Sequence, residues 1–186
     1  MVLNHVAGAR YPAGRPILKI GIAMADEIIT KEYLEQFFYY KDGFLYWKIS
    51  KGPAKAGNKA GRIIGAGYYQ LGLNRKVYSN HRLIFLMHHG YLPIEVDHKD
   101  NNKLNNRIEN LRAATSSQNS FNKPKRATNT SGVKGVNWDK GSNQWIARCE
   151  VGKKRYFLGR FNDIKEAEKV IVQFRNQHHG SFANNN

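Results

Sequence analysis

The sequence predicts an α+β protein in two modules joined by a linker, and three observations support this fold class. Hairpin and helix signals fill the first two thirds of the chain, while residues 123–130 are polar and basic, as linkers often are. Three strand-like segments and one helix-like segment then follow. We expect a first module over residues 26–122 and a three-stranded antiparallel sheet packed on one helix over 131–182, followed by a tail at 183–186.

The first module begins with a helix and a hairpin. Thr30 suits an N-cap, and apolar residues recur at helical spacing over 33–38, which predicts one short amphipathic helix. Asp42 and Gly43 then break the helical pattern and supply a turn, so the apolar residues on both sides of them predict a hairpin. A second hairpin is expected over residues 68–78.

A loop, a second helix and an N-terminal extension make up the rest of this region. Residues 52–67 are rich in Gly and Lys, which predicts a mobile basic loop rather than packed structure. Asn80 is expected to cap a helix with an apolar inner face, and Gly90 to end it. Residues 1–25 precede the clear periodicity and are expected to form a weakly folded extension.

The composition points to an anionic partner. Thirty Lys and Arg against 14 Asp and Glu give a formal net charge of +16, which favours polyanions such as double-stranded DNA. The alternative is that this charge only keeps the protein soluble. Cys149 is the single cysteine, which excludes an intrachain disulfide and a structural zinc site of several thiolates. No apolar run is long enough to cross a bilayer, so we expect no membrane partner and a cytoplasmic location in a bacterial host cell, near the nucleoid.

The segment after residue 94 carries residues suited to phosphodiester hydrolysis. That reaction needs a hard cation, and the carboxylate of Asp97 and the amide of Asn119 are ligands that Mg²⁺ or Mn²⁺ prefers. It also needs a base for water, and a neutral His98 at a strand end can accept that proton near pH 7. The Asn-rich stretch 101–106 is a solvated loop in most proteins, but here it joins two expected strands that hold Asp97 near Asn110.

Four residues within 81–122 resemble the signature of HNH homing endonucleases: Asp97, His98, Asn110 and Asn119. The resemblance implies a ββα-metal core, in which two strands and a helix surround one metal ion. It implies that His98 is the general base, that Asp97 and Asn119 bind the metal, and that Asn110 braces the loop holding His98. Many members have His at the last position, where this chain has Asn119, so the preference for Mg²⁺ over Mn²⁺ stays open.

The other histidines and Arg82 are assigned simpler roles. Arg82 opens the second helix beside His81, and we expect Arg82 to contact the DNA backbone and His81 to be structural. The adjacent pairs at 88–89 and 178–179 diverge on a helix and have no evident third ligand. We therefore expect solvated side chains at these pairs and no second metal site.

The second module is expected to bind DNA through one face of its sheet. Alternation over 145–151 directs Trp145, Ala147 and Cys149 toward the helix and Ile146 toward the opposite, basic face. Most of residues 131–182 resembles the Apetala-type, ethylene-response-factor DNA-binding domain, although Asn137 stands where that family often has a basic residue. The charges and this resemblance together imply DNA contacts by Lys134, Arg148, Glu150, Lys154, Arg155 and Arg160. The alternative is a basic sheet that is only solvated.

The sequence therefore predicts a site-directed, homing-type DNA endonuclease that needs a divalent metal ion but no small-molecule cofactor. One metal site per chain favours nicking of one strand, and double-strand cleavage would need a second chain or a second binding event, so both a monomer and a dimer stay open. One alternative is a sequence-specific DNA-binding regulator that does not cut, and another is RNA as the partner, bound by stacking on exposed aromatics.

Overall fold

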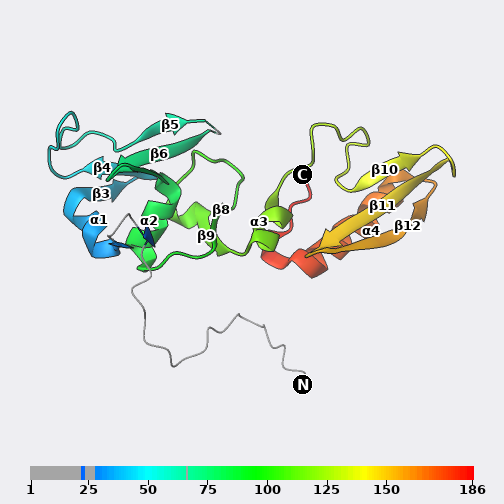
Figure 1. Ribbon diagram of the computed structural model, residues 1–186. Coiled ribbons are helices and arrows are strands. Elements are labelled where there is room, and N and C mark those ends of the chain that lie inside the picture. The colour runs from blue at the N-terminus through cyan, green and yellow to red at the C-terminus, as the bar shows by residue number, and fades with distance from the viewer. Residues whose placement is uncertain (1–21, 24–27, 66) are drawn as a thin grey trace, which may run out of the picture.

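The computed structural model describes residues 22–23, 28–65 and 67–186. The extension predicted over 1–25 lies almost entirely outside this part of the chain. Two bodies lie side by side, and helix α3 (Ser116–Asn122) lies between them, close to the C-terminus (Figure 1). No helix in the described part of the chain has the length and apolar character needed to cross a bilayer.

The first body contains two helices and several small antiparallel sheets. Helix α1 follows β1 and β2, and its N-cap is Thr30, as the sequence predicts, because the Thr30 hydroxyl accepts a hydrogen bond from the backbone of Tyr33 at 3.2 Å. Phe38, which the periodicity assigns to this helix, instead opens a strand. The elements in chain order are β1 (Ile22–Ala23), β2 (Ile28–Ile29), α1 (Lys31–Phe37), β3 (Phe38–Lys41), β4 (Phe44–Trp47), β5 (Arg62–Ile64), β6 (Tyr68–Leu73), β7 (Lys76–Ser79) and α2 (Asn80–His89).

Both predicted hairpins are present. β3 pairs with β4 across Asp42 and Gly43, and β6 pairs with β7 across Asn74 and Arg75. Asn74 and Arg75 have φ values of 46° and 64°, the left-handed conformation that a tight hairpin turn requires.

The prediction of a mobile loop over 52–67 is wrong for its second half. Ala60 is buried in the core, and β5 adds a third strand to the β6–β7 hairpin. The side chain of Asn80 donates to the carbonyl of Ala60 at 2.8 Å, so it is not the predicted helix cap. Ser79 is the N-cap instead, whereas Gly90 ends α2 in the left-handed conformation, as predicted.

A hairpin and a short helix complete the first body. β8 (Glu95–His98) pairs in antiparallel register with β9 (Leu111–Ala114), and the loop between them ends in the 3₁₀ turn η1 (Ile108–Asn110). Helix α3 packs against both strands and begins at a capping box built by Thr115 and Gln118. α2 packs on the other side of β8, where Val96 and Leu111 join the apolar core.

The second body is a three-stranded antiparallel sheet covered by one helix, as predicted. Its elements are β10 (Val136–Asp139), β11 (Gln144–Val151), β12 (Lys154–Phe161) and α4 (Ile164–His179), followed by the 3₁₀ turn η2 (Gly180–Phe182). Ala147 and Cys149 pack against Ala167 and Ile171 of α4, which confirms the predicted helix-facing side of β11. Ile146, expected on the opposite, open face, is buried, and a register shift follows Ala147.

The chain after α4 returns to the first body. His179 stacks on Phe121 of α3 with the ring centroids 3.8 Å apart and the planes nearly parallel. Asn184 donates to the backbone carbonyl of Asn122 at 2.7 Å. His179, which the sequence predicts to be solvated, is therefore buried between the two bodies.

Gly135 offers a test of packing in the second body. A Cβ atom there would lie 2.6 Å from both the Arg148 carbonyl oxygen and the Ile171 side chain, whereas one at Gly132 would meet nothing within 4 Å. Both glycines have a positive φ, so the backbone strain is shared. Gly135→Ala should therefore lower the free energy of unfolding by about 1–3 kcal/mol more than Gly132→Ala. Urea unfolding of the two variants measures this difference, and equal losses would contradict the packing described here.

Candidate active site

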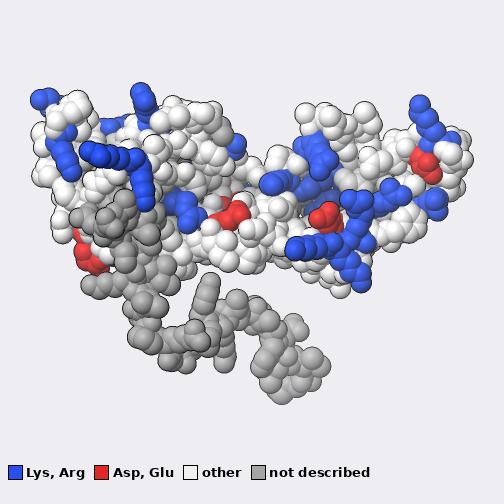
Figure 2. All heavy atoms as spheres, viewed as in Figure 1, with Lys and Arg blue, Asp and Glu red and all other residues white. Residues whose placement is uncertain are grey.

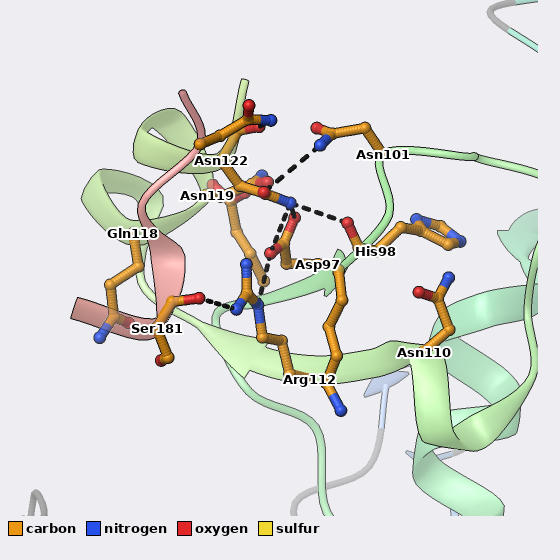
Figure 3. A network of polar contacts seen from close by, with 12 residues as sticks. Asp97, His98, Asn101, Asn110, Arg112, Gln118, Asn119, Asn122 and Ser181 are labelled. Carbon is orange, nitrogen blue, oxygen red and sulfur yellow. Dashed lines mark hydrogen bonds and ion pairs between the residues drawn. The ribbon is translucent and has the colours of Figure 1, made fainter. Parts of the chain in front are cut away.

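Neighbouring residues of β8 direct their side chains to opposite sides of the hairpin, as strand geometry requires. Glu95 and Asp97 face helix α3, where their carboxylates accept hydrogen bonds from Asn119 and Asn122. His98 faces the other way, and its ring lies 4.9 Å from the ring of His81 on α2. The predicted metal ligand and the predicted base are thus adjacent in sequence and buried, yet their side chains diverge (Figure 3).

The carboxylate of Asp97 is 5% exposed and is neutralised by Arg112 from the neighbouring strand. The Arg112 Nε donates to Asp97 Oδ2 at 2.7 Å. The amide of Asn122 donates to both carboxylate oxygens, at 3.0 and 3.1 Å, and to the backbone carbonyl of His98 at 2.8 Å. A buried carboxylate needs such partners, because loss of hydration otherwise makes its charge very costly.

Arg112 is in turn held by the C-terminal segment. Its Nη1 donates to the carbonyl of Ser181 at 2.6 Å (Figure 3). Its guanidinium carbon lies 3.7 Å from the centre of the Phe182 ring. Both contacts come from η2, beyond the second body. The segment after α4 therefore helps to orient the cation that neutralises Asp97.

The ring of His98 is oriented by one buried amide. His98 Nε2 lies 2.8 Å from Oδ1 of Asn106, which is 2% exposed. Because an amide oxygen only accepts, this contact makes Nε2 the protonated nitrogen and leaves the lone pair on Nδ1 in the neutral ring. A histidine in this tautomer has a nitrogen that can accept a proton.

His81 is buried beside His98 and is kept neutral. Its pKa is lowered to about 3, first by burial and then by the nearby His98 and Arg82. The ring of Tyr68 completes this cluster, 5.4 Å from His81 and 6.2 Å from His98. His98 therefore has an uncharged histidine ring as its neighbour.

Asn110 lies at the base of the loop that joins the two strands. Its amide nitrogen donates to Asp100 Oδ1 at 2.9 Å and to the carbonyl of Asn105 at 2.8 Å, and its oxygen accepts from the Asp100 backbone. Partial burial raises the pKa of Asp100, but hydrogen bonds from Asn105, Asn102 and Asn110 outweigh it and hold the pKa below its usual value. The contacts are those that a loop brace would make.

The side chain of Asn119 contacts Glu95 and not Asp97, although the sequence predicts that Asp97 and Asn119 bind the same metal ion. Its amide nitrogen donates to Glu95, two residues before Asp97 on the same side of β8. The structure therefore does not bring Asp97, His98 and Asn119 into direct contact. Within the described residues, no three His, Cys, Asp or Glu side chains gather closely enough to hold a metal ion by themselves.

Two of the residues predicted to contact DNA have internal partners. The guanidinium of Arg82 donates to the carbonyls of Pro93 and Ile94, at 3.3 and 3.1 Å. The ammonium of Lys134 donates to three carbonyls, those of Phe121, Lys123 and Asn184, which leaves no N–H for a phosphate. Burial, with a contribution from Arg175, lowers the pKa of Lys134 to about 8. In the structure Lys134 ties the two bodies together, a role that differs from the predicted one.

The remaining predicted DNA-contacting residues are exposed on the sheet of the second body. Arg148, Glu150 and Arg155 are exposed on β11 and β12, and Glu150 is paired in register with Arg155. Arg160 is exposed beside Phe157, and Lys154 beside Tyr156. The ring of Tyr156 packs on Phe174 of α4, so Lys154 lies on the helix-covered side at the end of the β11–β12 hairpin. Arg148, Glu150, Arg155 and Arg160 lie on the face that α4 does not cover, and contact with DNA stays a prediction for all five residues.

Arg112, Asn122 and Asn106 belong to the site but were not singled out in the sequence. Arg112 follows the Asn110-Leu111 pair, and antiparallel pairing places it opposite Asp97. That register was the available signal, since an arginine opposite a buried aspartate is a natural ion pair. Asn106 and Asn122 stand among many other asparagines, and nothing in the sequence separates them from solvated ones.

Comparisons with known proteins match the region that contains these residues. A family model described as HNH endonuclease matches residues 78–121. Protein 3.8 of Escherichia phage T7 is 38% identical over 89 residues, which are 47% of this chain and 72% of that protein. An uncharacterized HNH endonuclease of Acanthamoeba polyphaga mimivirus is 37% identical over 99 residues, which are 52% of this chain and 51% of that protein. No solved structure matches, and the Apetala-type resemblance after residue 130 stays a prediction.

The low pKa of His81 predicts a pH-dependent stability. Between pH 6.5 and about 3 the unfolded chain binds a proton at His81 that the folded chain does not, so stability falls as the pH falls through this window. His81→Gln should remove up to about 1.4 kcal/mol of that loss per pH unit. Urea unfolding between pH 7 and 4.5 measures the slope, with His178→Gln on the surface as the matched control. An unchanged slope in His81→Gln would contradict the assignment.

Proposed function

Because the chain belongs to the HNH endonuclease family, we propose that it hydrolyses phosphodiester bonds of double-stranded DNA as a site-directed, homing-type endonuclease acting inside a virus-infected or host cell. The observation that carries this proposal is the pair Asp97 and His98 on β8, buried and oriented by dedicated partners. A sheet that only supported a binding surface would not need a carboxylate and an imidazole with such partners.

His98 is proposed as the general base. Asn106 holds its Nε2, so Nδ1 is the nitrogen that accepts the proton of the attacking water. The neutral His81 beside it adds no positive charge that would oppose protonation of His98 during the reaction. Asn110 supports the same loop through Asp100 and Asn105 and is proposed as a positioning residue.

The donor set fits a magnesium ion that is shared with the substrate. Mg²⁺ typically keeps several waters and binds proteins through one or two carboxylates plus substrate phosphates, so a closed cage of three acidic ligands is not required. We propose that Asp97 and the amide oxygen of Asn119 hold it. The bond from Asn119 to Glu95 uses the amide nitrogen and leaves the amide oxygen for a cation. The oxygen of Asn122, by contrast, accepts a hydrogen bond from the Asn101 side chain at 3.3 Å. A bound Mg²⁺ would supply charge neutralisation for the phosphate and leaving oxygen.

One such site per chain is proposed to nick one strand by a one-metal mechanism. The exposed sheet of the second body would supply affinity for the target through Arg148, Glu150, Arg155 and Arg160, with Lys154 at its end. Arg82 is also proposed to contact the DNA backbone. It can do so only through the guanidinium N–H groups that are not bound to the carbonyls of Pro93 and Ile94.

A DNA-binding regulator that does not cut is the second candidate. The observation that favours it is the ion pair of Asp97 with Arg112, because this pair satisfies the carboxylate without a metal ion. The two candidates agree on DNA binding and differ only in chemistry. Cleavage is therefore the measurement that separates them.

Nicking of supercoiled plasmid with and without Mg²⁺ tests the proposed base. We expect His98→Gln to lower the nicking rate by about 10²–10⁴-fold, because Gln can still donate to Asn106 but has no basic nitrogen. His178→Gln, which changes an exposed histidine of α4 that makes no contact with Asp97, His98 or Asn119, is the matched control and should nick at the parent rate. Thermal unfolding of His98→Gln checks that the fold is retained. Nicking by His98→Gln at the parent rate would rule out this base, and the absence of nicking by the parent chain would favour the regulator.

The Mg²⁺ concentration at half-maximal nicking tests the proposed ligand. Asn119→Ala should raise this concentration at least about tenfold, because the cation loses one of two protein ligands, and Asn119→Asp should restore it by supplying a carboxylate oxygen. If Asn119→Ala needs no more Mg²⁺ than the parent, the amide beside Asp97, that of Asn122, becomes the better candidate.

A further inference from the structure

A groove of about 810 Å³ runs between helix α3 and the second body. The linker and the serine side of α3 form one wall, and the start of β10 with parts of β11 and β12 forms the other. Its floor contains the stacked pair of Phe121 and His179 and the tied ammonium of Lys134. The groove therefore lies where the two bodies are held together.

Cations from both walls face this groove. Lys123, Lys125 and Arg126 come from the linker, and Arg148 and Arg155 come from the sheet, while Glu150 is the carboxylate among the lining residues. Among the described residues, no ion pair involves any of these five cations. Lys and Arg side chains gather over this region on the face seen in Figure 2. The charge of the groove thus remains available to an anionic partner.

The linker is fixed in place rather than acting as a free tether. The backbone N–H of Lys125 donates to the carbonyl of Asn186 at 2.8 Å, and the Lys123 carbonyl accepts from Lys134. The side chain of Lys125 donates to the carbonyl of Gly132 at 2.9 Å. Cations on an ordered backbone lose less entropy when they bind an extended partner than cations on a flexible chain.

We propose that this groove binds the phosphate backbone of duplex DNA, between the recognition sheet and the nuclease site. The inference rests on the proposed function and names the path of the substrate. Serines at 116, 117 and 120 add hydroxyl donors of the kind that contact phosphates. Phe121 lines the groove while Asn119 and Asn122 face β8, so one helix, roughly 10 Å across, separates the bound backbone from Asp97.

Binding in this groove is independent of sequence, because it involves phosphates and not base edges. It sets the spacing between the target contacted by the sheet and the bond that is cut, since α3 is a shared wall of both sites. A flexible linker would leave that spacing variable.

Fluorescence anisotropy of a labelled duplex tests the groove, in EDTA so that no cleavage occurs. The variant Lys123→Ala/Arg126→Ala removes two exposed linker cations, and Lys165→Ala/Lys169→Ala removes two exposed cations of α4 as the matched control. We expect the first variant to reduce the slope of log K against log salt by about 1.8, since each phosphate contact contributes about 0.9. Its Kd should rise more than about tenfold at 100 mM salt, while the control changes far less.

Equal effects of the two double variants would overturn the groove, because they would show a dependence on net charge alone. Stronger binding to duplex RNA than to DNA of the same sequence would also overturn it. The assay does not depend on cutting, so a parent chain that fails to nick but loses affinity in the linker variant would refute the nuclease and leave the groove standing. A parent chain that nicks while the linker variant binds DNA with unchanged affinity would refute the groove and leave the nuclease standing.

Discussion

The contact on which the rest of this structure depends is the ion pair between Arg112 and Asp97. The carboxylate is buried on β8, and a fixed cation on the neighbouring strand offsets the free-energy cost of removing this charge from water. The same guanidinium reaches the Ser181 carbonyl and the Phe182 ring, so one side chain connects the nuclease hairpin to the end of the chain. Removing either partner would leave an unpaired charge in a site with little water, which is why these elements belong to one unit.

Helix α3 is contacted on one side by β8 and on the other by His179 at the end of α4. Its amides face β8, whereas Phe121 faces His179 and the groove. A seven-residue helix has little stability of its own, so its position must come from these tertiary contacts. Lys134, Asn184 and the linker backbone close the same junction through hydrogen bonds to main-chain carbonyls. The three-stranded sheet and the β8–β9 hairpin are therefore held in a defined relation, unlike two modules joined only by a flexible tether.

The opposite directions of Asp97 and His98 organise the chemistry proposed for the site. Alternation along β8 sends the carboxylate toward the amides of α3 and the imidazole toward α2, so each group has its own environment. Asp97 accepts hydrogen bonds from Arg112 and Asn122, while His98 lies beside a neutral histidine, a tyrosine and the amide of Asn106. Groups with separate tasks, one to hold charge and one to exchange a proton, benefit from such separation.

The sequence by itself determined the mixed helix and strand class, both hairpins, the helix-facing side of β11 and the HNH character of residues 78–121, because turn chemistry, alternation and motif spacing are local properties. It did not determine that Ala60 is buried and residues 62–64 form a strand, that His179 is buried, or that Arg112, Asn106 and Asn122 complete the site. Those outcomes depend on which distant segments meet. Ser181 and Phe182 lie about 70 residues beyond Arg112, and no periodicity spans that separation. Only tertiary packing brings them together, since a buried charge takes its partner from whatever the fold places beside it.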